Sequence, residues 1–203
     1  YKGIVISGDG PNFSAGANLN LILNAAYRKE WDLIDKMTKT MQNTFQSLRF
    51  APFPVVAAPF GFVLGGGYEI CGSCDRIIAA AESYIGLVEV GMGIIPGAGG
   101  NLRMLSNVSD NIKTMMPGSF PIVQKVFETV GFAKVATSAK EAKKLSYLRK
   151  DDRFILNRST LLSEAKNEVL AMSDDYKSPE IRTFKLPGSS GRLVVDASIK
   201  GFV

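Results

Sequence analysis

Three consecutive glycines at positions 65–67 are the feature that most restricts how this chain can fold. They follow two short apolar runs, residues 55–58 and 60–63, and they precede an acid, Glu69. Glycine lets a backbone or a ligand approach closely because it has no Cβ atom. A helix that begins at the triplet leaves its first N–H groups without intrahelical acceptors, at the positive end of the helix dipole. The triplet therefore predicts a turn into a helix whose N-terminus can bind an electron-rich oxygen.

The remaining pattern mixes short strands with helices and predicts an α/β fold. Apolar runs that predict strands occupy residues 2–7, 55–58, 60–63 and 76–80. Spacings that predict helices occupy residues 31–50, 121–130, 138–145 and 153–171. The end of the chain, residues 178–203, is punctuated by Pro and Gly and predicts a tail that wraps the domain or is partly loose. We divide the chain into a core of residues 1–118 and a C-terminal helical region and tail of residues 119–203.

Composition excludes several classes of protein. The 203 residues are 46% hydrophobic and 21% charged, as in globular proteins with a real core. No run of about 18 apolar residues is present, so we expect no membrane span. The net charge of +5 is mild, and the basic residues between positions 134 and 150 alternate with acids, which favours a solvated helix face over a nucleic-acid surface. The chain begins with Tyr1 and has no leader, so we expect a cytoplasmic piece of a longer polypeptide.

Histidine is absent, which excludes Ser-His-Asp and Cys-His catalysis and nearly every zinc site. We predict no metal site, and the chemistry must use carboxylates, backbone groups, Tyr, Lys or a borrowed cofactor. Cys71 and Cys74 have the spacing of a redox pair or of half a zinc site. No second pair completes such a site, so we favour two small residues packed against a core.

Two acids close to the glycines can move protons. Glu69 stands one helical turn after Gly66, so its carboxylate lies near the ligand of the free N–H groups. Glu89 would face the same ligand from the other side if the intervening strand doubles back. A second small-residue loop, residues 14–17, is the candidate for a further N–H donor. Two donors on one carbonyl oxygen stabilise an enolate, and two acids in an apolar site raise the pKa of at least one of them.

The same residues also have a plainer interpretation. The triplet can be only a tight turn, Glu69 a residue on the surface of a helix, and Glu89 an acid in a loop. Spacing alone does not separate this interpretation from the catalytic one.

Three ordered motifs resemble the enoyl-CoA hydratase/isomerase family, the crotonases. They are FSAGANL at residues 13–19, PVVAAPFGFVLGGGYEICGSCD at 54–75 and IGLVEVGMGIIPGAGGNLRML at 85–105. Residues 127–171 more weakly resemble a subgroup in which a crotonase domain is fused behind a 3-hydroxyacyl-CoA dehydrogenase. The resemblance implies a ClpP/crotonase-like β-β-α spiral with a C-terminal helical region that usually builds trimers or dimers of trimers.

The resemblance also implies roles for single residues. Ala17 and Gly66 match the oxyanion-hole N–H donors, and Glu69 and Glu89 match the catalytic glutamates of hydratases. Three further residues match substrate-binding positions of the family. They are Ala15 near the CoA adenine, Gly65 in the triplet, and Gly97 near the acyl end.

These matches imply an enoyl-CoA hydratase of fatty-acid β-oxidation that converts trans-2-enoyl-CoA to 3-hydroxyacyl-CoA. The alternatives are an enoyl-CoA isomerase of the same family and a non-catalytic oligomerisation domain of a multifunctional enzyme. Coenzyme A enters only as part of the substrate, no cofactor is expected, and any NAD would bind a fused domain. Two residues depart from the family. Asn18 stands where Asp is common, and Tyr68 stands where a smaller residue is common. We expect the Tyr68 ring to pack in the core rather than to reshape the acyl pocket.

Overall fold

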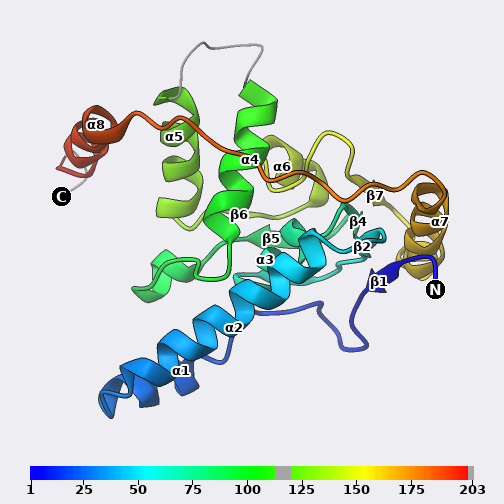
Figure 1. Ribbon diagram of the computed structural model, residues 1–203, viewed down its shortest axis with the longest axis horizontal. Coiled ribbons are helices and arrows are strands. Elements are labelled where there is room, and N and C mark those ends of the chain that lie inside the picture. Colours follow the sequence, from blue (N-terminus) through cyan, green and yellow to red (C-terminus); the bar gives the residue numbers. More distant parts are fainter. Residues whose placement is uncertain (113–119, 201–203) are drawn as a thin grey trace.

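Successive strands are distributed between two sheets in the computed structural model, which describes residues 1–112 and 120–200 (Figure 1). The first sheet has the order β1-β2-β4-β7 and is parallel throughout. The second has the order β3-β5-β6, with β3 parallel and β6 antiparallel to β5. The strands are β1 (Ile4–Ile6), β2 (Val55–Ala57), β3 (Phe62–Leu64), β4 (Arg76–Ala80), β5 (Tyr84–Gly86), β6 (Val135–Ala136) and β7 (Arg153–Ile155). The chain therefore advances as a spiral, and the predicted α/β class is confirmed.

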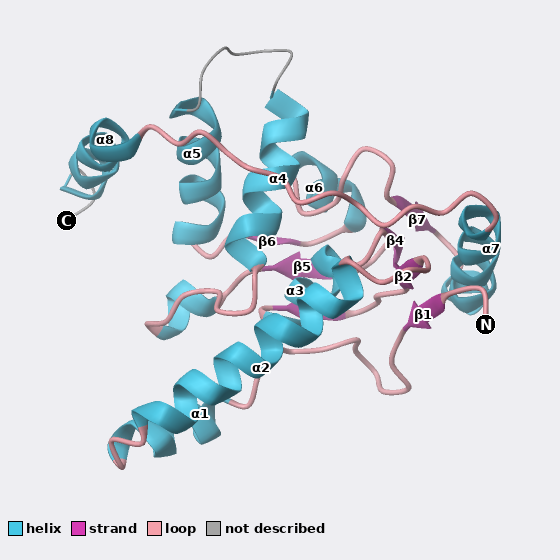
Figure 2. Cartoon of the chain, in the orientation of Figure 1, coloured by secondary structure: helices cyan, strands magenta, loops and turns pink. Residues whose placement is uncertain are grey.

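Helices surround these sheets (Figure 2). Those before residue 113 are α1 (Leu19–Tyr27), α2 (Trp31–Arg49), α3 (Gly66–Ser73) and α4 (Gly100–Ile112). Those after residue 119 are α5 (Phe120–Val126), α6 (Ala139–Lys144), α7 (Leu161–Ser173) and α8 (Gly188–Lys200). A short π-helical segment, Phe127–Gly131, continues α5. Helix α3 contacts both α2 and α4, so the helix that follows the glycine triplet lies at the centre of this layer.

The central strands are buried on both faces. In β2, Val55 packs in one core cluster and Val56 in another, and in β4 Ile77 and Ile78 divide in the same way. Successive side chains of a strand point to opposite faces, so both runs must be apolar at every position. This explains why the strands read as continuous hydrophobic runs.

Helix α7 covers the outer face of the first sheet. It contacts β1, β2 and β4. Leu161, Ala165 and Val169, spaced four residues apart, are its buried residues. The helix therefore supplies one stripe to the second core cluster.

The predicted helix over residues 153–171 is wrong in its first part. Residues Arg153–Ile155 form β7, which pairs in parallel with β4. Leu156 is 88% exposed, and the Asn157 side chain accepts a hydrogen bond from Ser159 N in a short 3-10 turn before α7 begins. The open edge of β4 and this Asx-type turn override the helical spacing.

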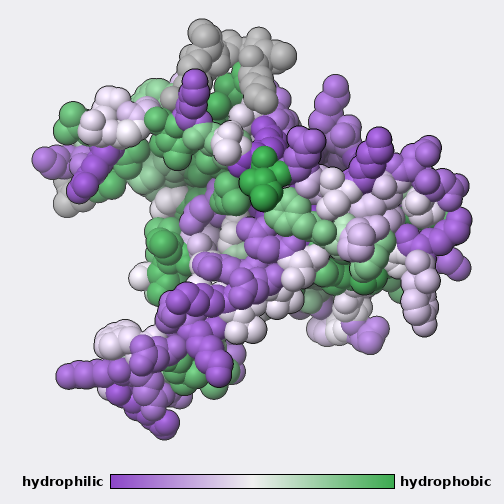
Figure 3. Space-filling view, viewed as in Figure 1, coloured by the Kyte–Doolittle hydropathy of each residue, from purple (hydrophilic) through white to green (hydrophobic). Residues whose placement is uncertain are grey.

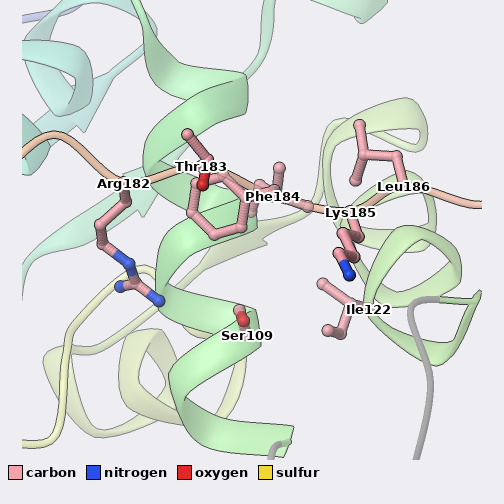
Figure 4. A pocket seen from close by; sticks show the side chains of 8 residues that line it. Ser109, Ile122, Arg182, Thr183, Phe184, Lys185 and Leu186 are labelled. Carbon is pink, nitrogen blue, oxygen red and sulfur yellow. The ribbon is translucent and has the colours of Figure 1, made fainter.

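Of the two alternatives predicted for residues 178–203, a tail that wraps the domain or is partly loose, the structure shows wrapping over residues 178–187 and a helix, which was not predicted, over Gly188–Lys200. Residues 174–187 cross α4 as a strap, and α8 follows. The Arg182 guanidinium donates to both carboxylate oxygens of Asp110, at 2.8 and 2.9 Å, and to Ser106 Oγ at 2.8 Å. Arg182 and the α4 residue Ser109 line a cavity of about 300 Å³. Figure 4 shows both side chains, with Arg182 on the strap and Ser109 on the helix. A bidentate arginine fastens this segment, which composition alone does not predict.

The predicted boundary between residues 118 and 119 lies outside the described residues. Segments from both sides of it share one sheet, since β7 extends the sheet that β1, β2 and β4 begin. Within residues 1–112 and 120–200, no helix is long and apolar enough to cross a membrane.

Candidate active site

A cavity of about 650 Å³ lies where the N-terminus of α3 meets α1, α2 and the segment after β5. All seven residues predicted as catalytic, oxyanion-hole or substrate-binding line it: Ala15, Ala17, Gly65, Gly66, Glu69, Glu89 and Gly97. Positions separated by up to 82 residues of sequence therefore meet at one site. Their individual roles stay predictions.

Glu69 is a buried carboxylate on the first turn of α3, with 2% of its surface exposed. Its Oε1 accepts hydrogen bonds from Ala98 N at 2.9 Å and from Gly100 N at 2.8 Å. Burial raises the pKa of Glu69, and the backbone hydrogen bonds oppose that rise. The plainer interpretation of Glu69 as a surface helix residue is therefore wrong.

Glu89 begins a short 3-10 helix, Glu89–Met92, shortly after β5 ends at Gly86. Its Oε2 is buried and has no hydrogen-bond partner among the described residues. Burial raises the pKa of Glu89 to about 7, and the nearby Glu69 charge adds to the rise. A carboxyl with this pKa holds its proton in about half of the molecules at neutral pH. The expectation that at least one acid would have a raised pKa is met by both.

Gly65 places the triplet against Glu89. Its φ is +54°, in the left-handed region that side-chain-bearing residues rarely adopt. A Cβ atom at this position would lie 3.0 Å from Glu89 Oε1. Gly65 N also donates to Gly86 O at 2.8 Å, which joins the triplet to β5. The strand thus doubles back as the sequence predicts, and only glycine fits between it and the helix.

The backbone nitrogens of Ala17 and Gly66 lie near each other beside these acids. Gly66 is the first residue of α3, so its N–H has no intrahelical acceptor. A Cβ atom at Gly66 would lie 4.0 Å from Ala17 N and 4.0 Å from Glu69 Oε2. The loop that carries Ala17 is held in place because Ser14 N donates to Phe62 O at 2.9 Å. The two candidate donors therefore lie in one region of the cavity, next to a carboxylate.

Helices α1 and α2 supply an apolar wall that the sequence did not assign to the site. Ile22, Ile34 and Met41 line the cavity. Ile34 and Met41 belong to the apolar residues that recur every three to four positions over residues 31–50. This spacing predicts that they face a core, but the helix presents them to the cavity instead. Gln42 of the same helix donates to Gly97 O at 2.7 Å and so positions the loop before α4. A polar residue beside an apolar stripe usually lies in solvent, so the sequence carries no signal for this contact.

Tyr68 packs in the core, as predicted. It is fully buried, and its hydroxyl donates to Tyr147 O at 2.9 Å and accepts from Asn107 Nδ2 at 3.2 Å. The neighbouring Cys71 and Cys74 are free and buried, and burial raises the pKa of Cys74 to about 12. A thiol with so high a pKa is a poor nucleophile, which favours the packing role of this pair over a redox role.

Comparison with known proteins decides the family. Residues 1–116 match the sequence model of the family described as enoyl-CoA hydratase/isomerase. The chain belongs to the enoyl-CoA hydratase/isomerase family. The match covers the whole cavity, including both acids and both N–H donors.

Relatives extend this result. A probable 3-hydroxyacyl-CoA dehydrogenase of Bacillus subtilis is 39% identical over 194 residues, which is 94% of this chain and 24% of that protein. The 2,3-dehydroadipyl-CoA hydratase of Escherichia coli is 34% identical over 112 residues, 55% of this chain and 42% of that enzyme. The chain thus spans less than half the length of either relative. Since the first match runs through both halves of the chain, the resemblance to a dehydrogenase-fused subgroup is confirmed.

Solved structures support the fold. The enoyl-CoA hydratase of Bacillus anthracis superposes with a TM-score of 0.66 at 27% identity, covering 84% of this chain and 58% of that one. The predicted crotonase spiral is therefore confirmed.

Proposed function

We propose that this chain carries a 2-enoyl-CoA hydratase site, which adds water across the C2=C3 bond of trans-2-enoyl-CoA thioesters in fatty-acid β-oxidation. The observation that carries the proposal is a pair of shielded carboxylates, Glu69 and Glu89, lining one cavity beside the N–H groups of Ala17 and Gly66. Isomerisation needs one group to move a proton, whereas hydration also needs a second to activate water. The naming of the Escherichia coli relative as a hydratase adds support.

The two N–H groups would hold the thioester carbonyl oxygen. As negative charge develops there, donors that are already in place stabilise the enolate without reorganisation. Ala17 and Gly66 suit this role because one donor comes from a loop and the other from the N-terminus of α3, and the two lie near each other. Ala15 and Gly65 would line the path of the thioester, and Gly97 its acyl end.

The two acids would share one proton. Glu89, as the carboxylic acid, donates its proton to C2, while Glu69, as the carboxylate, takes a proton from water whose oxygen bonds to C3. The C2=C3 π electrons form the new C2–H bond, so atoms and charge balance and the pair still holds one proton. Transfer of that proton from Glu69 back to Glu89 restores the starting state. The raised pKa of Glu89 suits the acid, and the two N–H bonds to Glu69 Oε1 suit the carboxylate.

The test is loss of the enoyl-thioester absorbance when crotonyl-CoA is mixed with the chain, beside the Glu89→Gln variant. We expect decay with the parent chain and none with the variant. If the parent chain is folded, binds butyryl-CoA and yet gives no decay, the hydratase proposal is wrong. Conversion of a 3-enoyl-CoA to the 2-enoyl isomer by the Glu69→Gln variant would then favour the isomerase.

Assembly and location follow from the same resemblance. We expect the parent protein to be a trimer or a dimer of trimers in the cytoplasm. Sedimentation velocity would measure its oligomeric state. A chain that assembles but neither binds nor converts any acyl-CoA would favour the oligomerisation role. NAD chemistry would belong to a fused dehydrogenase and not to residues of the cavity.

A further inference from the structure

A second cavity, of about 790 Å³, lies between α4, the α5 segment and α8. We call it the α4–α5–α8 groove. Its wall includes Leu102 and Leu105 from α4, Val126 and Phe132 from the α5 segment and the turn after it, and Ile199 from α8. None of the predicted catalytic residues lines it, so it is distinct from the space around the two acids.

The groove is apolar almost throughout. Of its 15 lining residues, Asn101 alone has a polar side chain, and none is charged. That amide is engaged, because Asn101 Nδ2 donates to Pro96 O at 3.2 Å. A peptide laid in such a groove would lose water from its backbone groups and find few hydrogen-bond partners in return. A hydrocarbon chain has no such requirement.

The groove adjoins the candidate active site. Ile95 and Pro96 line both cavities, so one short segment forms their common border. Ile95 is 72% exposed, and Leu102 and Phe132 are also partly exposed. Figure 3 shows hydrophobic side chains gathered on the side of the molecule between α8 and the segment that follows β5. Apolar surface of this extent beside a binding site indicates a ligand that continues into it.

We propose that the α4–α5–α8 groove binds the distal methylenes of a long acyl chain, so that long-chain enoyl-CoA thioesters bind more tightly than short-chain ones. This inference rests on the proposed function, which places the thioester between Ala17 and Gly66 and the acyl end near Gly97. Pro96 and Ile95, which line both cavities, directly precede Gly97 in the sequence, so the acyl end and the groove lie on either side of one short segment. Short acyl groups end before that border and gain nothing from it.

The first measurement is the dissociation constant of saturated butyryl-, octanoyl-, dodecanoyl- and hexadecanoyl-CoA, by calorimetry on the 203-residue chain. Each methylene that enters the groove should tighten binding by up to about fourfold. We expect dodecanoyl-CoA to bind at least tenfold more tightly than butyryl-CoA. These ligands cannot be hydrated, so the readout does not depend on turnover.

The matched variants are Leu102→Gln and Leu162→Gln. Leu102 lines the groove and is 40% exposed, while Leu162 lies on α7, is 58% exposed and lines neither cavity. We expect Leu102→Gln to reduce the ratio of dodecanoyl-CoA to butyryl-CoA affinity at least fivefold and Leu162→Gln to leave it unchanged. Both substitutions put an amide at a partly exposed helix position, so their effects on folding are comparable.

The outcomes separate the two proposals. If butyryl-CoA binds and dodecanoyl-CoA binds no more tightly, the groove proposal is wrong while the hydratase proposal stands. If no acyl-CoA binds to the folded chain, the proposed function fails and the groove proposal fails with it. If Leu102→Gln changes the sedimentation coefficient and leaves the chain-length dependence intact, the groove is a contact between copies of the chain and the acyl proposal is overturned.

Discussion

Glu69 and Gly100 are joined by a hydrogen bond of 2.8 Å, from the first N–H of α4 to the carboxylate of α3. Ala98 N donates to the same oxygen. One oxygen of Glu69 therefore anchors the loop before α4, while the other faces Gly66 and the cavity. The carboxylate combines a structural contact with the position needed to activate a water molecule.

Replacement of Glu69 by Gln should separate these two functions. The amide oxygen of Gln can still accept both N–H bonds, so we expect the melting temperature to change by less than about 3 °C. Loss of the base should reduce crotonyl-CoA hydration by at least about a hundredfold. Glu69→Ala is the comparison, because it leaves two buried N–H groups without an acceptor and should cost about 2 kcal/mol or more of stability. Equal stability of the two variants would contradict this division.

The stability of the chain should depend on pH through Glu89. Its pKa is about 7 in the folded chain and about 4.5 when unfolded, so the folded state holds a proton that the unfolded state releases. The contribution of this group to the free energy of unfolding is therefore fully present below about pH 4.5 and is lost as the pH rises through about 7. Glu89→Gln removes this loss of stability. We expect a gain of about 1 kcal/mol at pH 8, less than the full pKa shift would give, because the side chain is only partly buried and solvent screens it.

Thermal unfolding of Glu89→Gln and the parent chain, at pH 5 and pH 8, measures this effect. A gain of about 1 kcal/mol corresponds to about 2–4 °C for a chain of this size. The gain at pH 8 should exceed that at pH 5. An equal gain at both values would show that Glu89 is not the titrating group.

Catalysis should have an alkaline limb close to neutrality. The proposed pair is active with one shared proton, and the last proton leaves near the Glu89 pKa of about 7. The kcat/KM for hydration should therefore fall about tenfold per unit above that pH. Because hydration releases no net proton, the reverse dehydration should fall in the same way. Initial rates from pH 5.5 to 9 in both directions test this, and a rate that rises through pH 7 would assign Glu89 as the base.

The N–H of Gly66 can be removed without removing a side chain. Proline is favoured at the first position of a helix, so Gly66→Pro should leave α3 intact while it deletes one donor. We expect kcat to fall by about a hundredfold to a thousandfold. Gly66→Ala keeps the N–H, and its Cβ would lie 3.6 Å from the flexible Met41 Cε, so it is the control. If both variants lose the same activity, crowding and not the donor explains the loss.

Tyr68 should matter for stability and not for chemistry. Its hydroxyl is buried between Tyr147 O and Asn107 Nδ2. Tyr68→Phe removes the donor and should cost about 1–2 kcal/mol of unfolding free energy. We expect kcat with crotonyl-CoA to stay within twofold of the parent value. A large loss of activity in a folded variant would show that Tyr68 contributes to the acyl pocket and not only to the core.

Segments with strong local signals were predicted closely. The strand at residues 76–80 and the helix at residues 31–50 match β4 and α2 to within one residue. The triplet carries its own signal, since Gly65 needs a positive φ and the helix begins at the next residue. Glu69 could be placed at the site because it lies one helical turn after Gly66. Glu89 is 23 residues beyond Gly66, so its assignment needed the family resemblance and a strand that doubles back.

Segments whose structure depends on distant neighbours were predicted poorly. Residues Val135–Ala136 form a strand because Ile85 and Gly86 offer an open edge, and β7 forms on the edge of β4. Strands of two or three residues carry no periodicity of their own. The contact from Gln42 to Gly97 likewise depends on how α2 docks on a loop 55 residues away. Local spacing does not encode such contacts.

The position of α7 has a consequence for synthesis of the chain on the ribosome. Strands β1, β2 and β4 have all emerged once residue 80 is free, but the helix that covers their outer face ends at Ser173. Until then, Val56 and Ile78 have no cover on that side. A nascent chain that stalls in this interval would present an aggregation-prone apolar sheet, so a chaperone that binds such surfaces would protect it most between those two points.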